Sequence, residues 1–168
     1  MTTHLQPATL SRTEASRAVA QANAATAVIF HTSGSTGTAL RIERPLAGLL
    51  TEASVLAQIY ALAPRARIVG LVGHGHIYGF LHAVALPHHQ AQNASPCRSV
   101  TVLEPGTWRV TPDLPDPIDL LYIVPAVWGL SREILAARRV GCQVTAAGAF
   151  GPMRQAELAR LPHPPQRA

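Results

Sequence analysis

Short apolar runs alternate with longer segments of helical periodicity along this chain of 168 residues. Apolar residues recur every three to four positions from Leu46 to Leu62, which predicts a helix that begins just behind Pro45. The apolar runs themselves predict buried strands near Val28, Val69, Val102, Ile123 and Val144. Strands that alternate with helices favour right-handed βαβ units. We therefore expect one α/β domain with a mostly parallel central sheet flanked by helices.

A capping box marks the first helix. Ser11 and Glu14 have the spacing in which each side chain bonds the other residue's backbone, so a short helix is expected through about Ala24. This helix belongs to an expected N-terminal helical segment, residues 1–26. The main domain is then expected to cover residues 27–161, followed by a tail at 162–168.

Pro87 is expected to end a helix that begins at Ile77, because proline has no N–H to donate to the preceding turn. The polar stretch 88–96 behind it is expected to be a loop. Further helices are expected over 126–139 and 152–161, and a short strand over 108–111.

Composition excludes several classes of protein. Hydrophobic residues make up 48% of the chain and the mean hydropathy is +0.16, which is enough for a buried core. No apolar run is long enough to span a membrane, and the start of the chain has no secretory signal pattern, so we expect a cytoplasmic protein. The charge of +5 is scattered and aromatic residues are only 5%, which argues against nucleic-acid binding. Two cysteines, Cys97 and Cys142, are expected to be free thiols.

The small-residue loop at 32–37 is the strongest functional signal. It follows the apolar run at Ala27–Phe30 and is expected to lie where a strand gives way to a helix. Its backbone N–H groups and hydroxyls suit a phosphate, and Gly34 and Gly37 allow close backbone approach. It is not a Walker A sequence, because no Gly-Lys-Ser/Thr follows. The alternative is a flexible connector.

This loop, Thr-Ser-Gly-Ser-Thr-Gly, resembles the phosphate loop of the AMP-forming acid ligases, which include acyl- and aryl-CoA synthetases, luciferases and adenylation domains. Three further segments resemble that family's motifs in the family's order. They are Val72–Gly79, Tyr122–Leu130 and Ala146–Met153. The His-x-His-Ile-Tyr-Gly form within the first of these is most similar to the branch associated with aryl-polyene pigments. The resemblance covers roughly residues 27–155.

The resemblance implies an ATP site and an acid site, with Mg²⁺ accompanying ATP in the intact family. The ATP site would comprise Thr32, Ser33, Gly34, Ser35, Thr36, Gly37 and Arg41. The acid site would comprise His74, His76, Tyr78, Gly79, Ala147 and Gly148. Arg41 stands near the position of the family's Pro-Lys pair and would neutralise phosphate charge. It is equally interpreted as a solvated residue at the end of a loop.

A rival interpretation adds His82, His88 and His89 to the two preceding histidines as metal ligands. No carboxylate or cysteine accompanies the cluster in sequence, so no metal site is expected. Each of these three histidines is also compatible with a purely structural role at a helix start.

The resemblance also implies that the chain is a truncated form of the family's large domain. The family's adenine- and ribose-binding segments, its hinge and its lysine-bearing C-terminal domain have no counterpart here, and the chain contains no lysine. The family joins a carboxylic acid to AMP and then transfers the acyl group to the thiol of CoA or an acyl carrier protein. We expect an incomplete copy that is weakly active or inactive. The alternatives are a non-catalytic interaction module and one half of a split ligase that pairs with a complementary polypeptide.

Overall fold

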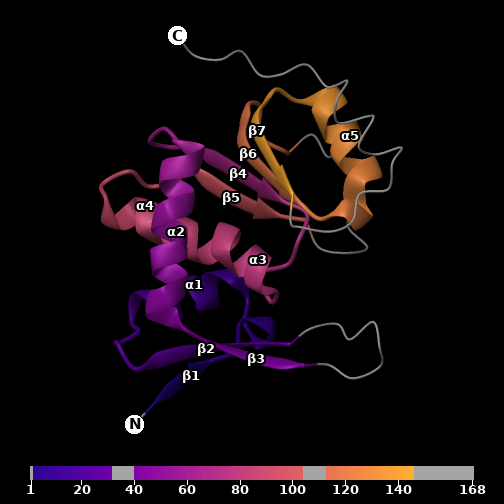
Figure 1. Cartoon of the computed structure of the whole chain (residues 1–168). Coiled ribbons are helices and arrows are strands. Elements are labelled where there is room, and N and C mark those ends of the chain that lie inside the picture. Colours follow the sequence, from indigo (N-terminus) through magenta and orange to yellow (C-terminus); the bar gives the residue numbers. More distant parts are fainter. Residues whose placement is uncertain (1, 32–39, 104–112, 146–168) are drawn as a thin grey trace.

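A computed structural model of the chain describes residues 2–31, 40–103 and 113–145 (Figure 1). Four strands form a parallel sheet in the order β5-β4-β6-β7. Their bounds are Arg67–Gly70 for β4, Ser99–Val102 for β5, Ile118–Ile123 for β6 and Val140–Thr145 for β7. This sheet and the helices on its faces confirm the expected α/β class. The expected strand at 108–111 and helix at 152–161 lie outside the described residues.

A second, three-stranded sheet was not expected. It contains β1 (Thr3–Leu5), β2 (Thr26–His31) and β3 (Arg41–Pro45), with β2 in the middle. Strand β1 pairs with β2 in parallel, and β3 pairs with it antiparallel. The expectation that Val28 lies in the central sheet is therefore wrong, because β2 finds both of its partners in this smaller sheet.

Strand β3 also corrects the expected surroundings of the loop at 32–37. The chain leaves β2, returns along it as β3, and only then enters helix α2 (Leu46–Tyr60), so a strand follows the loop instead of a helix. The strand was missed because Arg41–Pro45 contains a single large aliphatic residue, Ile42, among charged neighbours. Such a segment has almost no alternating apolar signal.

The first helices begin as their capping residues predict. In α1 (Arg12–Ala20), Glu14 N–H donates to Ser11 Oγ at 3.3 Å and Ser11 N–H donates to Glu14 Oε2 at 2.8 Å, which confirms the capping box. A 3-10 turn, η1 (Pro7–Thr9), precedes it. Helix α2 begins directly after Pro45, as expected, and ends at Ala61 with a left-handed φ of 46°.

The expectation that Pro87 ends a helix is wrong. Helix α3 (Ile77–Phe80) continues through a π-helical turn, η2 (Leu81–Ala85), into α4 (Leu86–Gln92), so most of the expected loop is helical. In this wider turn the N–H of Leu86 donates to the carbonyl of Leu81, five residues earlier. The changed register lets the helix accommodate a residue that lacks an N–H and whose ring crowds an ordinary helical turn.

The parallel sheet has one apolar core on each face. Ile68, Leu120 and Tyr122 lie in the core that reaches through α2 and η2 to β2, so these helices fill the space between the two sheets (Figure 1). Their neighbours Val69 and Leu121 face the opposite way, toward the 3-10 turn η3 (Pro125–Val127) and helix α5 (Trp128–Ala137). Alternate residues of each strand thus serve different cores. No helix among the described residues is long and apolar enough to cross a membrane.

Candidate functional site

The loop at Thr32–Gly37 lies outside the described residues, but the ends of the strands that carry it do not. His31 ends β2 and Arg41 begins β3, and these two residues are paired across the strands at the last rung before the loop. Ala147 and Gly148 also lie outside the described part of the chain. The contribution of all eight residues to ATP or acid binding therefore stays a prediction.

Arg41 lies exposed at the base of this loop and forms an ion pair. Its Nη2 lies 2.8 Å from Glu43 Oε2, and the other oxygen of Glu43 lies 3.3 Å from His4 Nε2 on β1. Residues two apart on a strand share a face, which brings the two side chains together. An anion bound at the loop would therefore meet a guanidinium whose charge is partly balanced by Glu43.

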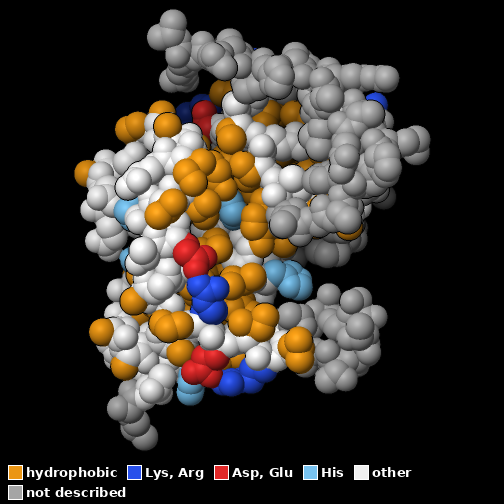
Figure 2. Space-filling model, viewed as in Figure 1, with side chains coloured by type: hydrophobic (Ala, Val, Ile, Leu, Met, Phe, Trp, Pro, Cys, Tyr) orange, Lys and Arg blue, Asp and Glu red, His pale blue; other side chains and the backbone are white. Residues whose placement is uncertain are grey.

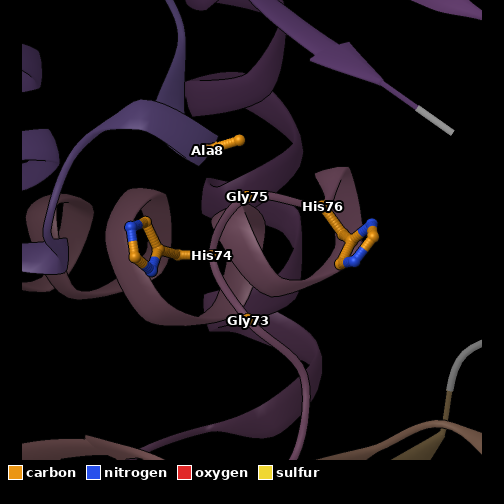
Figure 3. Close-up of a pocket in the computed structure, with 5 residues that line it drawn as sticks. All are labelled: Ala8, Gly73, His74, Gly75 and His76. Atoms are coloured by element: carbon orange, nitrogen blue, oxygen red, sulfur yellow. The ribbon is translucent and has the colours of Figure 1, made fainter. Parts of the chain in front are cut away.

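The two histidines of the turn after β4 point in opposite directions from Gly75 (Figure 3). Together with Ala8, Gly73 and Gly75 they line a pocket of about 330 Å³, a size at the lower end of the range for small-ligand sites. His76 is exposed. The pocket lies between this turn and η1, so the N-terminal segment contributes to its wall.

His74 connects this turn to the N-terminal segment. Its Nε2 lies 2.8 Å from the carbonyl oxygen of Leu10, and because a carbonyl only accepts, Nε2 carries the proton. In the neutral ring Nδ1 is then an acceptor, and it is buried without a partner. The side chain thus has one structural bond and one unused nitrogen.

Gly79 is placed where only glycine fits. A Cβ there would lie 2.1 Å from the carbonyl oxygen of Gly73 and 2.9 Å from that of Val72. The close contact lets α3 start directly against the turn that carries both histidines. The structure thereby gives Gly79 a packing function, and a contact between Gly79 and substrate stays a prediction.

The hydroxyl of Tyr78 is buried without a hydrogen-bond partner. Burial, and then the nearby Tyr60 and Cys142 side chains, raise the pKa of Tyr78 well above its ordinary value, so the phenol stays neutral. A buried polar atom left unpaired costs about 1–3 kcal/mol, and a bound ligand that pairs with it removes that cost. His74 and Tyr78 are therefore the two expected acid-site residues that each have a buried, unpaired polar atom, and of these two His74 lines the pocket described above.

Sequence reasoning missed Tyr60 and Tyr122, and it assigned His82 only to a metal cluster or a helix start. His82 and Tyr122 pack against the ring of Tyr78, Tyr60 packs against His82, and His82 stacks on Tyr122 with ring centroids 5.0 Å apart. Tyr60 lies 22 residues from His82, and no spacing rule relates residues on separate helices. Among the residues that the structure describes, no group of three or more His, Cys, Asp or Glu side chains could hold a metal, and both cysteines are free thiols, as expected.

Comparison with known proteins gives relatives at the level of sequence and at the level of fold. The chain matches no protein-family profile. It is 32% identical over 126 residues to a 4-coumarate–CoA ligase of Rhodobacter capsulatus, a match that covers 74% of this chain and 28% of that protein.

Solved structures show the same fold at lower sequence identity. An acyl-CoA synthetase (AMP-forming)/AMP-acid ligase II-like protein from Dyadobacter fermentans matches 86% of this chain and 40% of its own, with a TM-score of 0.63 and 20% identity. VinN in complex with L-aspartate matches 78% of this chain and 32% of its own, with a TM-score of 0.53 and 16% identity. An ATP-bound RpMatB–BxBclM chimera matches 72% of this chain and 24% of its own, with a TM-score of 0.51 and 16% identity.

The chain therefore has the fold of part of an adenylate-forming enzyme and spans well under half the length of each of these proteins. The sequence match and the shared fold together support a relationship to the AMP-forming acyl-CoA synthetase/ligase superfamily.

Proposed function

We propose that this chain supplies the phosphate-binding loop and one wall of the acid pocket to an AMP-forming acid–thiol ligase. In that reaction a carboxylate attacks the α-phosphate of ATP, which forms acyl-AMP and releases pyrophosphate, and the acyl group then passes to a thiol of CoA or an acyl carrier protein. The main support is the fold that 86% of the chain shares with the Dyadobacter fermentans ligase-like protein. In this chain the loop sequence joins β2 to β3, and the His-Ile-Tyr-Gly segment begins α3.

Each residue has a distinct proposed task. Backbone N–H groups and hydroxyls at Thr32–Gly37 bind the ATP phosphates, and Arg41 adds a cation that is bidentate and permanently charged. His76 and Tyr78 border the acid, with the unpaired Tyr78 hydroxyl donating to or accepting from it. Mg²⁺ accompanies ATP in the family, but the described residues offer no cluster that would hold it, so we assign it no step here.

We further propose that the acid is an acyl or aryl acid of the kind used by the aryl-polyene branch, and that the chain alone is weakly active or inactive. The rate of adenylation depends on in-line positioning and on charge stabilisation of the transition state. This chain spans 28% of the length of its 4-coumarate–CoA ligase relative, and it contains no lysine. We expect weak ATP binding by the full chain and no turnover.

Amide hydrogen exchange with and without ATP tests the nucleotide site. We expect ATP to slow exchange at residues 32–37 and AMP to have a smaller effect, because the loop binds the outer phosphates. Replacement of Gly34 and Gly37 by Val should abolish the protection, since side chains there block close approach of the backbone.

The fold of that double variant should be unchanged, with exchange in β4 and β6 as the internal control. Equal exchange in the loop with and without ATP would contradict the proposal. Acid-dependent pyrophosphate exchange by the chain alone would instead show that it is a complete adenylating enzyme.

A second candidate function is a module that binds a complementary polypeptide, either as half of a split ligase or without catalysis. Helix α2 favours it, because Val55 and Ile59 are 48% and 68% exposed one helical turn apart. The single charged residue of α2, Glu52, is already paired with Arg44. Figure 2 shows apolar side chains over the middle of the face on which α2 lies.

Sedimentation of the chain with and without candidate partner polypeptides tests this function. Binding that is lost in a Val55→Glu, Ile59→Glu variant would support the module, since two charges there prevent apolar burial. A partner that binds both forms equally would show that α2 is not the interface.

A further inference from the structure

A hydrogen-bonded pair, Tyr60 and His82, joins the end of α2 to the π-helical turn η2. His82 Nδ1 lies 2.8 Å from the carbonyl oxygen of Tyr78, so Nδ1 carries the proton and donates. His82 Nε2 is then an acceptor in the neutral ring, and the Tyr60 hydroxyl, 2.8 Å away, donates to it. The two bonds together fix the tautomer and the orientation of the imidazole.

The interior keeps this imidazole neutral. His82 is 1% exposed, and burial lowers its pKa although the bond to the Tyr78 carbonyl partly opposes the effect. Burial also raises the pKa of Tyr60 to about 12, with a smaller contribution from Cys142. Both members of the pair are therefore uncharged at neutral pH, and their hydrogen bonds hold in a single arrangement.

Tyr78 is held through this pair by its backbone and by its ring. Its carbonyl accepts from His82, and its ring centroid lies 4.4 Å from that of His82 and 6.0 Å from that of Tyr122. Tyr122 is itself fixed, since its hydroxyl donates to the Val72 carbonyl at 3.3 Å and its ring fills the space beside Gly70. The hydroxyls of Tyr60 and Tyr122 each have a hydrogen-bond partner, whereas the hydroxyl of Tyr78 has none.

The π-helical turn makes this arrangement possible. His82 lies within Leu81–Ala85, directly after the short helix that carries Tyr78. A π turn widens the helix and redirects its side chains, and such turns are frequent at functional sites. Here the turn places the imidazole of His82 against Tyr78, four positions earlier, and against Tyr60 at the end of α2.

We propose that Tyr60 and His82 are positioning residues that hold the backbone and ring of Tyr78, and through them the side chain that the proposed function assigns to the acid pocket. The pair itself touches no proposed substrate group and acts through Tyr78 alone. This inference rests on the proposed function, because that function assigns Tyr78 to the acid pocket. Its structural part, that the pair orients Tyr78, is independent of any ligand.

Tyrosine ring NMR of the full chain, labelled with ¹³C at tyrosine, tests the structural part. The chain has three tyrosines, so the spectrum of Tyr60→Phe contains only the tyrosine signals of Tyr78 and Tyr122. We expect the Tyr78 signal to move, because the His82 ring that contacts it loses one of the two hydrogen bonds that fix its orientation. The Tyr122 signal should move less, since its contacts with Gly70 and Val72 hold the ring even though it also stacks on His82.

Two substitutions of His82 complete the test. His82→Gln retains a donor and an acceptor and should leave Tyr78 close to its original state, whereas His82→Phe retains a ring but removes both bonds and should shift Tyr78 further than Tyr60→Phe does. A larger movement of Tyr78 than of Tyr122 in Tyr60→Phe and His82→Phe supports the proposal, since Tyr122 is also held by its contacts with Gly70 and Val72. Unchanged signals, or equal movement of Tyr78 and Tyr122, overturn it, because the pair would then serve only general packing.

A ligand measurement separates this inference from the proposed function. Cinnamate, an aryl acid, should shift the Tyr78 signal in the unchanged protein, and Tyr60→Phe should weaken its binding about tenfold. No response to cinnamate in the unchanged protein would count against the acid pocket, while the ligand-free spectra decide whether the pair orients Tyr78. Equal affinity for cinnamate in the unchanged protein and in Tyr60→Phe would overturn the positioning role.

Discussion

The two sheets of this protein differ in how completely they are buried. In the parallel sheet, β4 and β6 contribute side chains to a core on each face, and Leu120, Leu121 and Tyr122 are fully buried. In the smaller sheet only the central strand β2 is buried, whereas β1 and β3 are largely exposed edges. The parallel sheet is therefore the better-packed scaffold, and the smaller sheet is held to the core mainly through β2.

The exposed edge of the smaller sheet carries features that discourage pairing with other strands. Strand β3 bears Arg41, Glu43 and Arg44 and ends at Pro45, which has no N–H to offer a neighbouring strand. Figure 2 shows charged side chains around this end of the molecule. This argues against β3 as an association edge and places the proposed partner surface on α2 instead.

Removing a core side chain from each sheet should give the largest contrast. Leu121→Ala should lower the free energy of unfolding by about 3 kcal/mol, because it leaves a cavity between β6 and α5. The matched change in the smaller sheet, Ile42→Ala, should cost about 1 kcal/mol, since Ile42 is only half-buried. Urea unfolding measures both. Equal losses would show that the sheets are equally packed.

A methyl group added at Gly79, where α3 meets the turn after β4, should have the next largest effect on stability. Gly79→Ala should lower the free energy of unfolding by about 2–3 kcal/mol, because its Cβ meets backbone that cannot turn aside. Gly48→Ala is the control, since nothing lies within 4 Å of its Cβ inside α2, and it should stabilise by about 0.5–1 kcal/mol. A mild effect of Gly79→Ala on thermal unfolding would contradict the close contact.

Stability should fall as the pH is lowered from 7 to 5. Burial lowers the pKa of His82 below its ordinary value of 6.5, so under acid conditions the unfolded chain binds a proton that the folded protein excludes. One such group contributes a slope of at most about 1.4 kcal/mol per pH unit. His82→Gln should reduce the slope, and the remainder is expected from His88, whose pKa burial also lowers.

The carboxylates affect stability in a lower pH range than the histidines do. Hydrogen bonds from Ser11 lower the pKa of Glu14, and those from Arg139 lower the pKa of Asp116, so their contribution is lost only below about pH 4.5. Unfolding measured between pH 5 and 7 therefore reports mainly on the histidines. An unchanged slope in His82→Gln would show that His82 is not the titrating group.

Arg41→Ala should have the smallest effect on stability, under about 0.5 kcal/mol, because its ion pair with Glu43 is exposed. If Arg41 binds phosphate as proposed, the ATP concentration needed for half-protection of the loop should rise several-fold. Glu43→Gln is the matched variant, since it removes the competing carboxylate and should lower that concentration. Changes of opposite sign in the ATP concentration for half-protection would support the ATP site. Equal changes in the two variants would refute it.

Most of the fold was predictable, whereas little of the candidate site was. Four expected strands, near Val69, Val102, Ile123 and Val144, occur where their apolar runs indicated, and the Ser11–Glu14 capping box starts its helix. The path of α3 through Pro87 was not predictable, because it depends on a change of helical register that has no sequence signature. The Tyr60–His82 pair was not predictable either, since no periodicity connects two separate helices.

The sequence by itself determined which segments are buried, because a run of aliphatic residues gains free energy from leaving water in almost any compact arrangement. Only the tertiary structure decided that β2 joins a second sheet, that His74 bonds a carbonyl 64 residues earlier and that Tyr78 keeps a buried, unpaired hydroxyl. These outcomes depend on directional hydrogen bonds and ring contacts between distant residues. Such interactions form only once packing has fixed the distances between the elements that carry them.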